Sequence, residues 1–305
     1  MSTTTDSTSR HSGRVLPAPA TMASPSWWGA DSERHRMPPG PAGEPATFVK
    51  VIRPVSTAYV DVTASFSATR AAGLSGLGPR VLQASAPTRT IVLEDLTAHA
   101  KTATLDDFLD PGLLERYLSA RRSVQALQVP HVRRASVFDD LRHALGLARR
   151  HAAALPADLA WMLRVLDDAE SRITASGVDS AFCHGDGNVS NVLLTGSGEV
   201  LLLDWDVAAV MDPAQDTGVV LTELAATEDD ARALFERIHG AWDAALFARA
   251  RVYGAADLVR WALIGAYVDS AEPGTLEYSK FSDWQFMRAR WALGDRAFDN
   301  RLQDL

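Results

Sequence analysis

The feature that most constrains this chain is the stretch CHGDGNVSNVLLTGSGEVLLLDWDVAAVMDP, residues 183–213, in which acidic and amide side chains stand among apolar runs. The apolar runs 192–194 and 200–203 are separated by the turn sequence TGSGE, which predicts a β-hairpin. Patterns typical of amphipathic helices lie on both sides of it. A carboxylate beside buried strands is costly unless its charge is compensated. The stretch therefore predicts a hairpin that carries polar functional groups inside a mainly helical region.

Three side chains of this hairpin are spaced so that they can act together. Asp186 lies in the loop before the first strand, Asn191 lies at the start of that strand, and Asp204 ends the second strand. A hairpin places the start of one strand beside the end of its partner, so Asn191 and Asp204 can converge on one ion. Mg²⁺ favours oxygen ligands of this kind. Each residue alone is typical of a turn or a cap, but together they indicate a site for phosphoryl transfer.

Composition and periodicity divide the chain into three parts. Residues 1–25 are rich in Ser, Thr, Pro and Ala and lack apolar periodicity, which predicts a disordered tail. Residues 26–96 predict a small lobe of strands around one helix, and residues 97–305 predict a large, mainly helical lobe. The expected segments are strands in ERHRM, TFVKVIR, GLGPRVLQA and RTIVLEDL, a helix in VTASFSATRAAGL, and helices over residues 110–127, 136–155 and 156–177.

Charge and composition exclude several classes of protein. The formal net charge of −8 argues against binding to nucleic acid or to an anionic membrane surface, because both require a basic field. Cys183 is the single cysteine, so an internal disulfide is impossible, and we expect it to be a small buried residue. No apolar run approaches the roughly 18 residues of a membrane span, and the N-terminus lacks the pattern of a secretory signal. We expect a cytoplasmic protein.

The spaced motifs resemble those of a known superfamily. His184-Gly185-Asp186 with Asn191, then DWD at 204–206 and DPAQD at 212–216, resemble the catalytic core of the aminoglycoside phosphotransferase and choline kinase superfamily. Its members are distant relatives of protein kinases, and the segments TLDDFLDPGLLERY and EYSKFSDWQFMRAR are most similar to bacterial choline/ethanolamine kinase-like proteins. The resemblance implies an α+β, protein-kinase-like two-lobe fold, with a small β-sheet N-lobe on the nucleotide side and a large helical C-lobe that contains the catalytic hairpin.

The resemblance also implies a role for each matching residue. Asp186 is the catalytic carboxylate that faces the acceptor hydroxyl, and Asn191 and Asp204 are the Mg²⁺ ligands. ATP is the implied cofactor. The other implied roles are phosphate binding by Lys50 of FVKV and adenine binding by Glu94 and Leu96 of the linker IVLEDL. We expect His184 to support the loop, and Asp206 to act either at the metal or through a structural hydrogen bond. We expect Asp212 and Asp216 to cap the next helix or to brace the loop through backbone amides.

The acceptor is expected to be a small molecule with a hydroxyl and a cationic amine. Choline kinases bind a quaternary ammonium against aromatic faces, and the resemblance points to Trp261, Trp284 and Trp291 of the C-terminal helices. Trp284 and Trp291 are seven residues apart and share one helix face, although aromatic residues at this spacing are also typical of a core. Choline or ethanolamine is the first candidate. An aminoglycoside or another amino alcohol is the second, because Gly185 stands where many choline kinases have Asn.

Two departures from the superfamily pattern favour a different class, a non-catalytic pseudokinase that serves as a binding module. Related kinases carry a Glu on the small-lobe helix that aims the strand lysine, but here Ser65 takes that place and Asp61 is the nearest acid. The segment expected to cover the phosphates, SPSWWGADSERHRM, has one glycine and the bulky pair Trp27 and Trp28.

Overall fold

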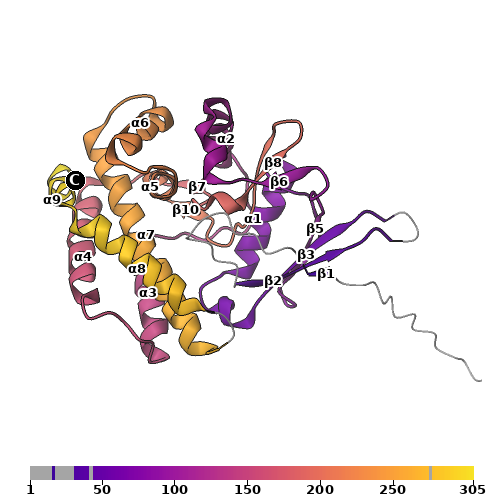
Figure 1. Ribbon diagram of the computed structural model, residues 1–305, viewed down its shortest axis with the longest axis horizontal. Coiled ribbons are helices and arrows are strands. Elements are labelled where there is room, and N and C mark those ends of the chain that lie inside the picture. Colours follow the sequence, from indigo (N-terminus) through magenta and orange to yellow (C-terminus); the bar gives the residue numbers. More distant parts are fainter. Residues whose placement is uncertain (1–15, 18–30, 41–43, 275–276) are drawn as a thin grey trace, which may run out of the picture.

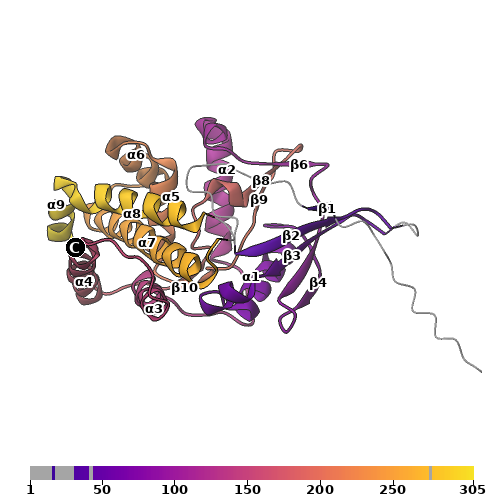
Figure 2. The same ribbon diagram turned by 60° about the horizontal axis from the view of Figure 1, so that its bottom comes forward.

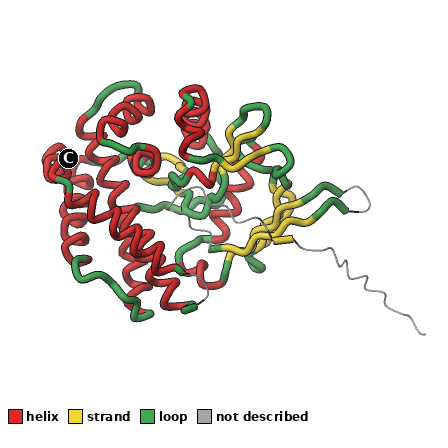
Figure 3. Tube along the Cα trace, viewed as in Figure 1, coloured by secondary structure: helices red, strands yellow, loops and turns green. Residues whose placement is uncertain are grey.

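The computed structural model describes residues 16–17, 31–40, 44–274 and 277–305. In the described part of the structure, most strands lie toward one end of the folded molecule and most helices toward the other (Figure 3). The N-terminal sheet is antiparallel, with strand order β1-β2-β3-β5-β4 (Figure 1). Its strands are β1 (Leu16–Pro17), β2 (Ser32–Met37), β3 (Thr47–Ile52), β4 (Val81–Ser85) and β5 (Thr90–Glu94).

One helix, α1 (Val62–Leu74), packs against this sheet through Phe66, which joins Ile52 and Ile91 in a small core. The helix spans the predicted segment, and four strands lie in the predicted segments. The fifth, β1, falls inside the predicted tail, where its two residues pair with Arg36 and His35 of β2. The edge of a sheet offers unpaired backbone groups to any extended segment, so this pairing needs no apolar pattern. The rest of the predicted tail lies outside the described residues.

The C-terminal part is mainly helical, as predicted. Its helices are α2 (Pro111–Val124), α3 (Val137–Arg150), α4 (Leu159–Ser176), α5 (Pro213–Leu224), α6 (Glu228–His239), α7 (Ala244–Ala271), α8 (Tyr278–Gly294) and α9 (Arg296–Asp304). Helix α7 is buried along most of its length and packs against α3, α5 and α8 (Figure 1, Figure 2). Within the described residues, no helix combines the length and apolarity needed to cross a membrane.

The predicted hairpin is confirmed. Strands β8 (Val192–Thr195) and β9 (Val200–Leu202) pair antiparallel, with Val192 opposite Leu202. A third strand, β6 (Ala100–Thr102), pairs with the other edge of β8. Strands β7 (Ala181–Cys183) and β10 (Ala209–Met211) form a separate antiparallel pair whose ends flank the hairpin in sequence. The loops that carry Asp186 and Asp204 are therefore fixed at both ends by short strands.

Helices α5 and α7 approach each other closely at Gly218 and Gly254. A Cβ atom at Gly254 would lie 2.2 Å from Thr222 Oγ1, and one at Gly218 would lie 2.2 Å from the carbonyl oxygen of Ala250. Neither distance is sterically possible without movement of a helix. The two glycines therefore set the separation of α5 and α7, which both contribute to the site described below.

Replacing Gly254 with alanine should lower the free energy of unfolding by about 1–3 kcal/mol, because the added methyl overpacks this contact. Gly146 in α3 is the matched control. Its Cβ would meet only the flexible end of Arg150, at 3.2 Å, so alanine there should stabilise the protein by about 0.5–1 kcal/mol. Urea denaturation measures both effects. Equal midpoints for the Gly254→Ala and parent proteins would contradict the close approach.

Candidate active site

The loop that follows β7 depends on a glycine. Gly185 has a φ of +77°, in the left-handed region that L-residues other than Asn and Asp rarely adopt. A Cβ atom there would lie 2.9 Å from Met211 Cε and 3.1 Å from the Val207 carbonyl oxygen. Both the positive φ and the lack of space for a Cβ atom therefore favour glycine at this position.

Asp186 is held at the centre of the site by the loop that contains it. Its Oδ1 accepts a hydrogen bond from the Asn188 backbone N–H at 2.8 Å, and its Oδ2 accepts one from Asn191 Nδ2 at 2.7 Å. Burial raises the pKa of Asp186 to about 7; the Asn188 N–H opposes this rise, and the Asp204 carboxylate adds to it. The structure therefore brings together Asp186 and Asn191, two of the three hairpin residues singled out from the sequence.

The Asp186 loop is braced from behind by a buried ion pair. Arg121 of α2 makes two hydrogen bonds to the carboxylate of Asp216, at 2.6 and 3.1 Å, and its Nη1 donates to the Asp186 carbonyl oxygen at 2.7 Å. Asp216 also accepts from the Gly185 N–H at 2.7 Å. The predicted bracing role of Asp216 is seen directly. Arg121 was missed, although an arginine on the apolar face of a predicted helix is a signal for a buried partner.

His184 supports the site as a neutral ring. Its Nε2 lies 2.8 Å from the carbonyl oxygen of Leu203, and its Nδ1 accepts a weak hydrogen bond from the Asp186 N–H at 3.3 Å. Burial, and after it the nearby Arg121 guanidinium, lower the pKa of His184 to about 4. The ring packs against Trp205, with centroids 4.5 Å apart. His184 therefore links the Asp186 loop to the end of β9, and its low pKa argues against a role as a base.

Asp204 and Asp206 share the ammonium group of Lys50. Lys50 Nζ lies 2.7 Å from Asp204 Oδ1 and 2.8 Å from Asp206 Oδ2. Burial disfavours the charged lysine, but these carboxylates and that of Asp31 outweigh it and raise the pKa of Lys50 well above its usual value. Asp204 has a φ of +61°, a conformation that Asp tolerates better than most residues. The strand lysine thus reaches the end of the hairpin.

The small-lobe helix reaches this ion pair through Ser65. Its hydroxyl donates to Asp206 Oδ1 at 2.6 Å, and the serine is 3% exposed. Asp61, the acid nearest in sequence, does not take the place of the missing glutamate. Its carboxylate accepts from the Ala64 N–H at 3.0 Å and caps the first turn of α1. An N-cap residue is directed at the free N–H groups of its own helix, so it is not available to the lysine.

Asp31 is a member of the site that sequence reasoning missed. It lies just before β2, inside the segment expected to cover the phosphates, and it is 5% exposed. One carboxylate oxygen from each of Asp31, Asp204 and Asp206 lies within 4.8 Å of the others. The sequence signal for it was an acid directly before β2, the strand that pairs with the Lys50 strand β3. Trp27, Trp28 and Gly29 lie outside the described residues.

A cavity of about 190 Å³ lies between the N-terminal sheet and the hairpin. Lys50 and Asp204 lie at one part of its wall, and Glu94 and Leu96 of the linker lie at another. The cavity wall also includes apolar side chains from both parts of the chain: Phe48, Leu93, Leu193 and Leu202. The Glu94 carboxylate accepts hydrogen bonds from the Arg80 backbone and side chain, at 2.8 and 3.0 Å. The three residues predicted to bind the nucleotide, Lys50, Glu94 and Leu96, therefore line one cavity together with the two predicted metal ligands, Asn191 and Asp204.

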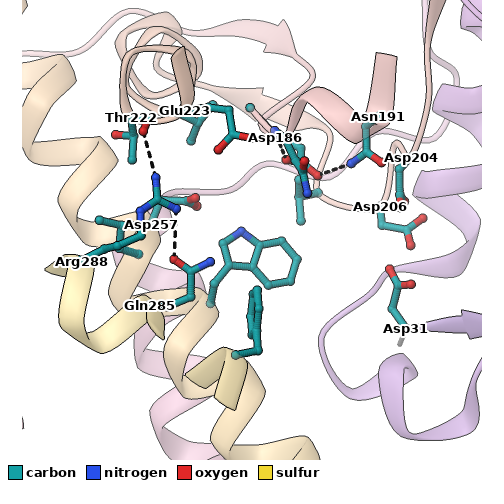
Figure 4. A pocket seen from close by; sticks show the side chains of 17 residues that line it. Asp31, Asp186, Asn191, Asp204, Asp206, Thr222, Glu223, Asp257, Gln285 and Arg288 are labelled. Carbon is teal, nitrogen blue, oxygen red and sulfur yellow. Dashed lines mark hydrogen bonds between the residues drawn. The ribbon is translucent and has the colours of Figure 1, made fainter. Parts of the chain in front are cut away.

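A second cavity is lined by Asp186 and shares Asn191 and Asp204 with the first (Figure 4). Asp186, Asn191 and Asp204 lie on one side of it, and residues of α5, α7 and α8 lie opposite. The opposite wall consists of Thr222, Glu223, Asp257, Leu258, Trp261, Phe281, Gln285 and Arg288. Asp257 forms an ion pair with Arg260 at 2.5 Å, and the guanidinium of Arg260 also lies 4.7 Å from the ring centroid of Trp261. We refer to this space as the acceptor cavity.

The three candidate tryptophans are not brought into one pocket. Trp261 lines the acceptor cavity, whereas Trp284 and Trp291 line another cavity between α5, α7, α8 and α9. Trp284 and Trp291 do share a helix face, with ring centroids 6.1 Å apart and planes at 87°. The face of α8 that meets the acceptor cavity carries Phe281, Gln285 and Arg288 instead. Phe281 therefore lines the acceptor cavity together with Trp261, and the sequence pattern did not identify it.

Comparisons with solved structures match this fold. A choline/ethanolamine kinase family protein from Mesorhizobium loti aligns over 97% of this chain and 93% of its own, with 19% identity and a TM-score of 0.76. Choline kinase LicA from Streptococcus pneumoniae aligns over 88% and 92%, with 14% identity and a TM-score of 0.71. A spectinomycin phosphotransferase aligns over 92% of each chain, with 14% identity and a TM-score of 0.58. A search of curated proteins found no significant match.

These identities establish the fold alone, and the predicted protein-kinase-like fold is confirmed. The family itself is established separately, by a model described as the phosphotransferase enzyme family that matches residues 46–258. The matched range contains Lys50, Asp186, Asn191 and Asp204, and it covers more than half of the chain. The chain therefore belongs to the phosphotransferase enzyme family.

Proposed function

We propose that this protein transfers the γ-phosphoryl group of ATP to a hydroxyl of an amine-bearing small molecule, with choline or ethanolamine as the first candidates. One observation carries the proposal. Asn191 and Asp204 line both cavities, with Lys50 beside them in the cavity next to the N-terminal sheet and with Asp186 in the other cavity, opposite a wall of acids and aromatic rings. A complex of LicA with AMP and a complex of spectinomycin phosphotransferase with ADP and spectinomycin support nucleotide use.

The residues near Asp186 fit a hard divalent cation. Asn191 and Asp204 offer amide and carboxylate oxygens, and Asp206 and Asp31 add two more carboxylates close by. Oxygen donors of this type suit Mg²⁺, which needs only one or two carboxylates besides phosphate and water. A bound Mg²⁺ neutralises charge on the phosphates during transfer. Asn191 and Asp204 are the proposed ligands, as inferred from the sequence.

In the proposed reaction, Asp186 orients the acceptor. The bond from the acceptor oxygen to the γ-phosphorus forms while the bond from that phosphorus to the β,γ-bridging oxygen breaks. The Asp186 carboxylate accepts the hydroxyl proton. Its two hydrogen bonds, from Asn188 and Asn191, fix its orientation toward the acceptor cavity. Lys50 holds negative charge on the phosphates of ATP.

The pair Ser65 and Asp206 takes over the task of the missing helix glutamate. With Asp204 as a ligand of Mg²⁺, Lys50 would contact phosphate oxygens of ATP in place of that carboxylate. Asp206, held by the Ser65 hydroxyl, remains as the carboxylate partner that aims Lys50. Ser65 is thus a positioning residue, and its presence does not require the loss of activity that defines a pseudokinase.

Replacing Ser65 with alanine should lower kcat/KM for ATP by about tenfold, since a hydrogen bond to a charged group is worth about 1.5–3 kcal/mol. The KM for the acceptor should change little, and Ser65→Thr should restore most of the loss. Ser67 on the same helix accepts from the His131 N–H and does not contact Asp206, so Ser67→Ala is the control. Steady-state kinetics with each substrate varied would test this. Equal effects of both alanines would contradict the positioning role.

The acceptor cavity supports a cationic amine. Glu223 and Asp257 place two carboxylates in its wall, and Trp261 and Phe281 place two aromatic rings there. Acids attract an ammonium by charge, and aromatic faces attract it by cation–π interaction, worth about 0.5–2 kcal/mol per contact. Both types of contact suit an amino alcohol whose hydroxyl points to Asp186.

Replacing Trp261 with alanine should raise the KM for the acceptor by about tenfold, because an aromatic contact to the amine is lost, while the KM for ATP stays nearly constant. Trp242 is the control. It packs against Phe235 and Phe247, and Trp242→Ala should leave both constants unchanged. Initial rates with choline and ethanolamine measure the effect. A rise in the KM for ATP instead of the acceptor would place Trp261 on the wrong side of the site.

A panel of acceptors tests the function itself. Purified protein with ATP and Mg²⁺ should release ADP with choline or ethanolamine, and omission of Mg²⁺ should stop the release. Turnover only with an aminoglycoside or another amino alcohol would keep the reaction and replace the acceptor. Absence of both turnover and nucleotide-induced thermal stabilisation across the panel would favour the pseudokinase instead.

A further inference from the structure

The cavity between α5, α7, α8 and α9 has a lining rich in arginine. It measures about 330 Å³ and carries Arg251, Arg288 and Arg301 in its wall, with Asp295 as its one acidic lining residue among those described. Arg251 comes from α7, Arg288 from α8 and Arg301 from α9. Each of these three helices thus contributes one arginine to the same cavity, which we call the arginine cavity. Such a lining is unusual in a chain with a net charge of −8.

Neighbouring acids do not neutralise these cations fully. Arg251 and Arg301 share a single carboxylate oxygen of Glu228, at 3.6 and 2.7 Å. Asp295 accepts a hydrogen bond from the Ala297 N–H at 2.9 Å and caps α9. Burial and the nearby Arg301 guanidinium lower the pKa of Arg251, with Glu228 and Asp295 opposing the shift. Arg288 lies near Glu223 and Asp257 instead. Among the described residues, Arg251 and Arg301 therefore have one ion-pair partner between them, Glu228.

Several donors of the arginine cavity are buried without an acceptor. The Nε atoms of Arg251 and Arg301 and the indole Nε1 of Trp284 have no hydrogen-bond partner in the part of the chain that the structure describes. Arg301 is only 5% exposed, so an unmade hydrogen bond there is costly. Guanidinium and indole N–H groups donate and cannot accept. Their natural partner is a ligand that carries several acceptor oxygens and negative charge.

We propose that the arginine cavity binds an oxyanion, a phosphoryl or carboxylate group, at Arg251, Arg301 and Trp284. A planar guanidinium matches both groups with two parallel hydrogen bonds. The volume accommodates a small anion with ordered water, since one water occupies about 30 Å³ in the liquid. Trp291 beside it is 62% exposed, so the cavity reaches the surface. The arginine cavity adjoins the acceptor cavity at Thr222, Leu258 and Arg288, but Asp186 does not line it, and the proposed anion binding does not depend on the kinase reaction.

Isothermal titration calorimetry of the full chain, with sodium phosphate and separately with sodium succinate at constant ionic strength, tests the site. The parent protein should bind at least one of the two probes. Arg251→Gln should weaken that binding by about tenfold or more, because a charge-assisted hydrogen bond is removed. Arg237→Gln, which removes a charge from the exposed face of α6, should leave it unchanged. Binding of phosphate alone or of succinate alone identifies which oxyanion the cavity prefers.

Two further variants separate this site from the active site and from misfolding. Phosphate could also bind near Lys50, so Lys50→Ala should retain the affinity that Arg251→Gln loses. The Arg251 side chain is 22% exposed, and its replacement should leave the melting temperature nearly unchanged, whereas Arg301→Gln should reduce affinity and stability together. The proposal is overturned if neither probe binds the parent protein. It is also overturned if Lys50→Ala abolishes binding while Arg251→Gln preserves it.

Discussion

Asp186→Asn should lower kcat by about 10²–10⁴-fold, the range that a positioned proton acceptor contributes. Asparagine keeps the size of the side chain but cannot take the hydroxyl proton. In Asp186 both carboxylate oxygens accept hydrogen bonds, one from the Asn188 N–H and one from the Asn191 amide. The substitution replaces one of these acceptor oxygens with an NH₂ group, which donates. One of those hydrogen bonds must be lost. The measurement is ADP release at saturating ATP and acceptor.

Two controls make this result interpretable. Asp167→Asn, at an exposed position on α4, should leave kcat unchanged. The Asp186→Asn protein should still bind ATP and keep its melting temperature within a few degrees, because the nucleotide side of the site is intact. If Asp186→Asn retained kcat within a few-fold of the parent value, Asp186 would not be the catalytic carboxylate and the proposed reaction would lose its central residue.

Arg121→Met should lower the free energy of unfolding by about 3–5 kcal/mol, the cost of leaving one member of a buried ion pair without its partner. The substitution should also disturb the active site, because Arg121 donates a hydrogen bond to the Asp186 carbonyl oxygen and its partner Asp216 accepts one from the Gly185 N–H. Any protein that folds should therefore show a lower kcat as well. Denaturant titration and single-substrate kinetics measure the two effects.

The adjacent residue provides a matched control. Arg122 pairs with Glu115 on the same helix, but its side chain is 46% exposed, so Arg122→Met should cost less than about 1 kcal/mol. If the two variants lost similar amounts of unfolding free energy, the burial and the loop contacts of Arg121 would not contribute to stability. Replacing Asp216 with asparagine in the Arg121→Met background should recover part of the lost stability, since the orphaned charge is removed.

The hairpin illustrates what periodicity reveals. Two short apolar runs around a turn sequence are a local signal, and β8 and β9 form where that signal lies. The helices of residues 110–177 and helix α1 were predicted within a few residues for the same reason. Strand β6, the pair β7 and β10, and strand β1 were not expected. These strands are two to three residues long and owe their existence to partners distant in sequence, so no local pattern indicates them.

The site divides in a similar way. Spaced motifs pointed to Asp186, Asn191, Asp204 and Lys50. In the fold, Asn191 and Asp204 line both cavities, whereas Asp186 lines the acceptor cavity and Lys50 lines the cavity next to the N-terminal sheet. The partner of Lys50 was misjudged, because proximity in sequence suggested Asp61. A side chain at a helix N-terminus is engaged by its own helix, whereas Ser65, one turn later, faces the hairpin. The direction of a side chain depends on helix rotation and docking, which a spacing of four residues does not reveal.

The family and the order of the helices and the hairpin could be predicted from the sequence, and Asn191 and Asp204 could be proposed from it as metal ligands, because each inference depends on local spacing and residue chemistry. Tertiary structure alone decided that Arg121 braces the Asp186 loop, that Asp31 joins the acidic group, and that Trp261 faces the acceptor cavity while Trp284 and Trp291 line another. These contacts join segments that lie tens to well over a hundred residues apart. Only the packing of helices and sheet sets which side chains meet.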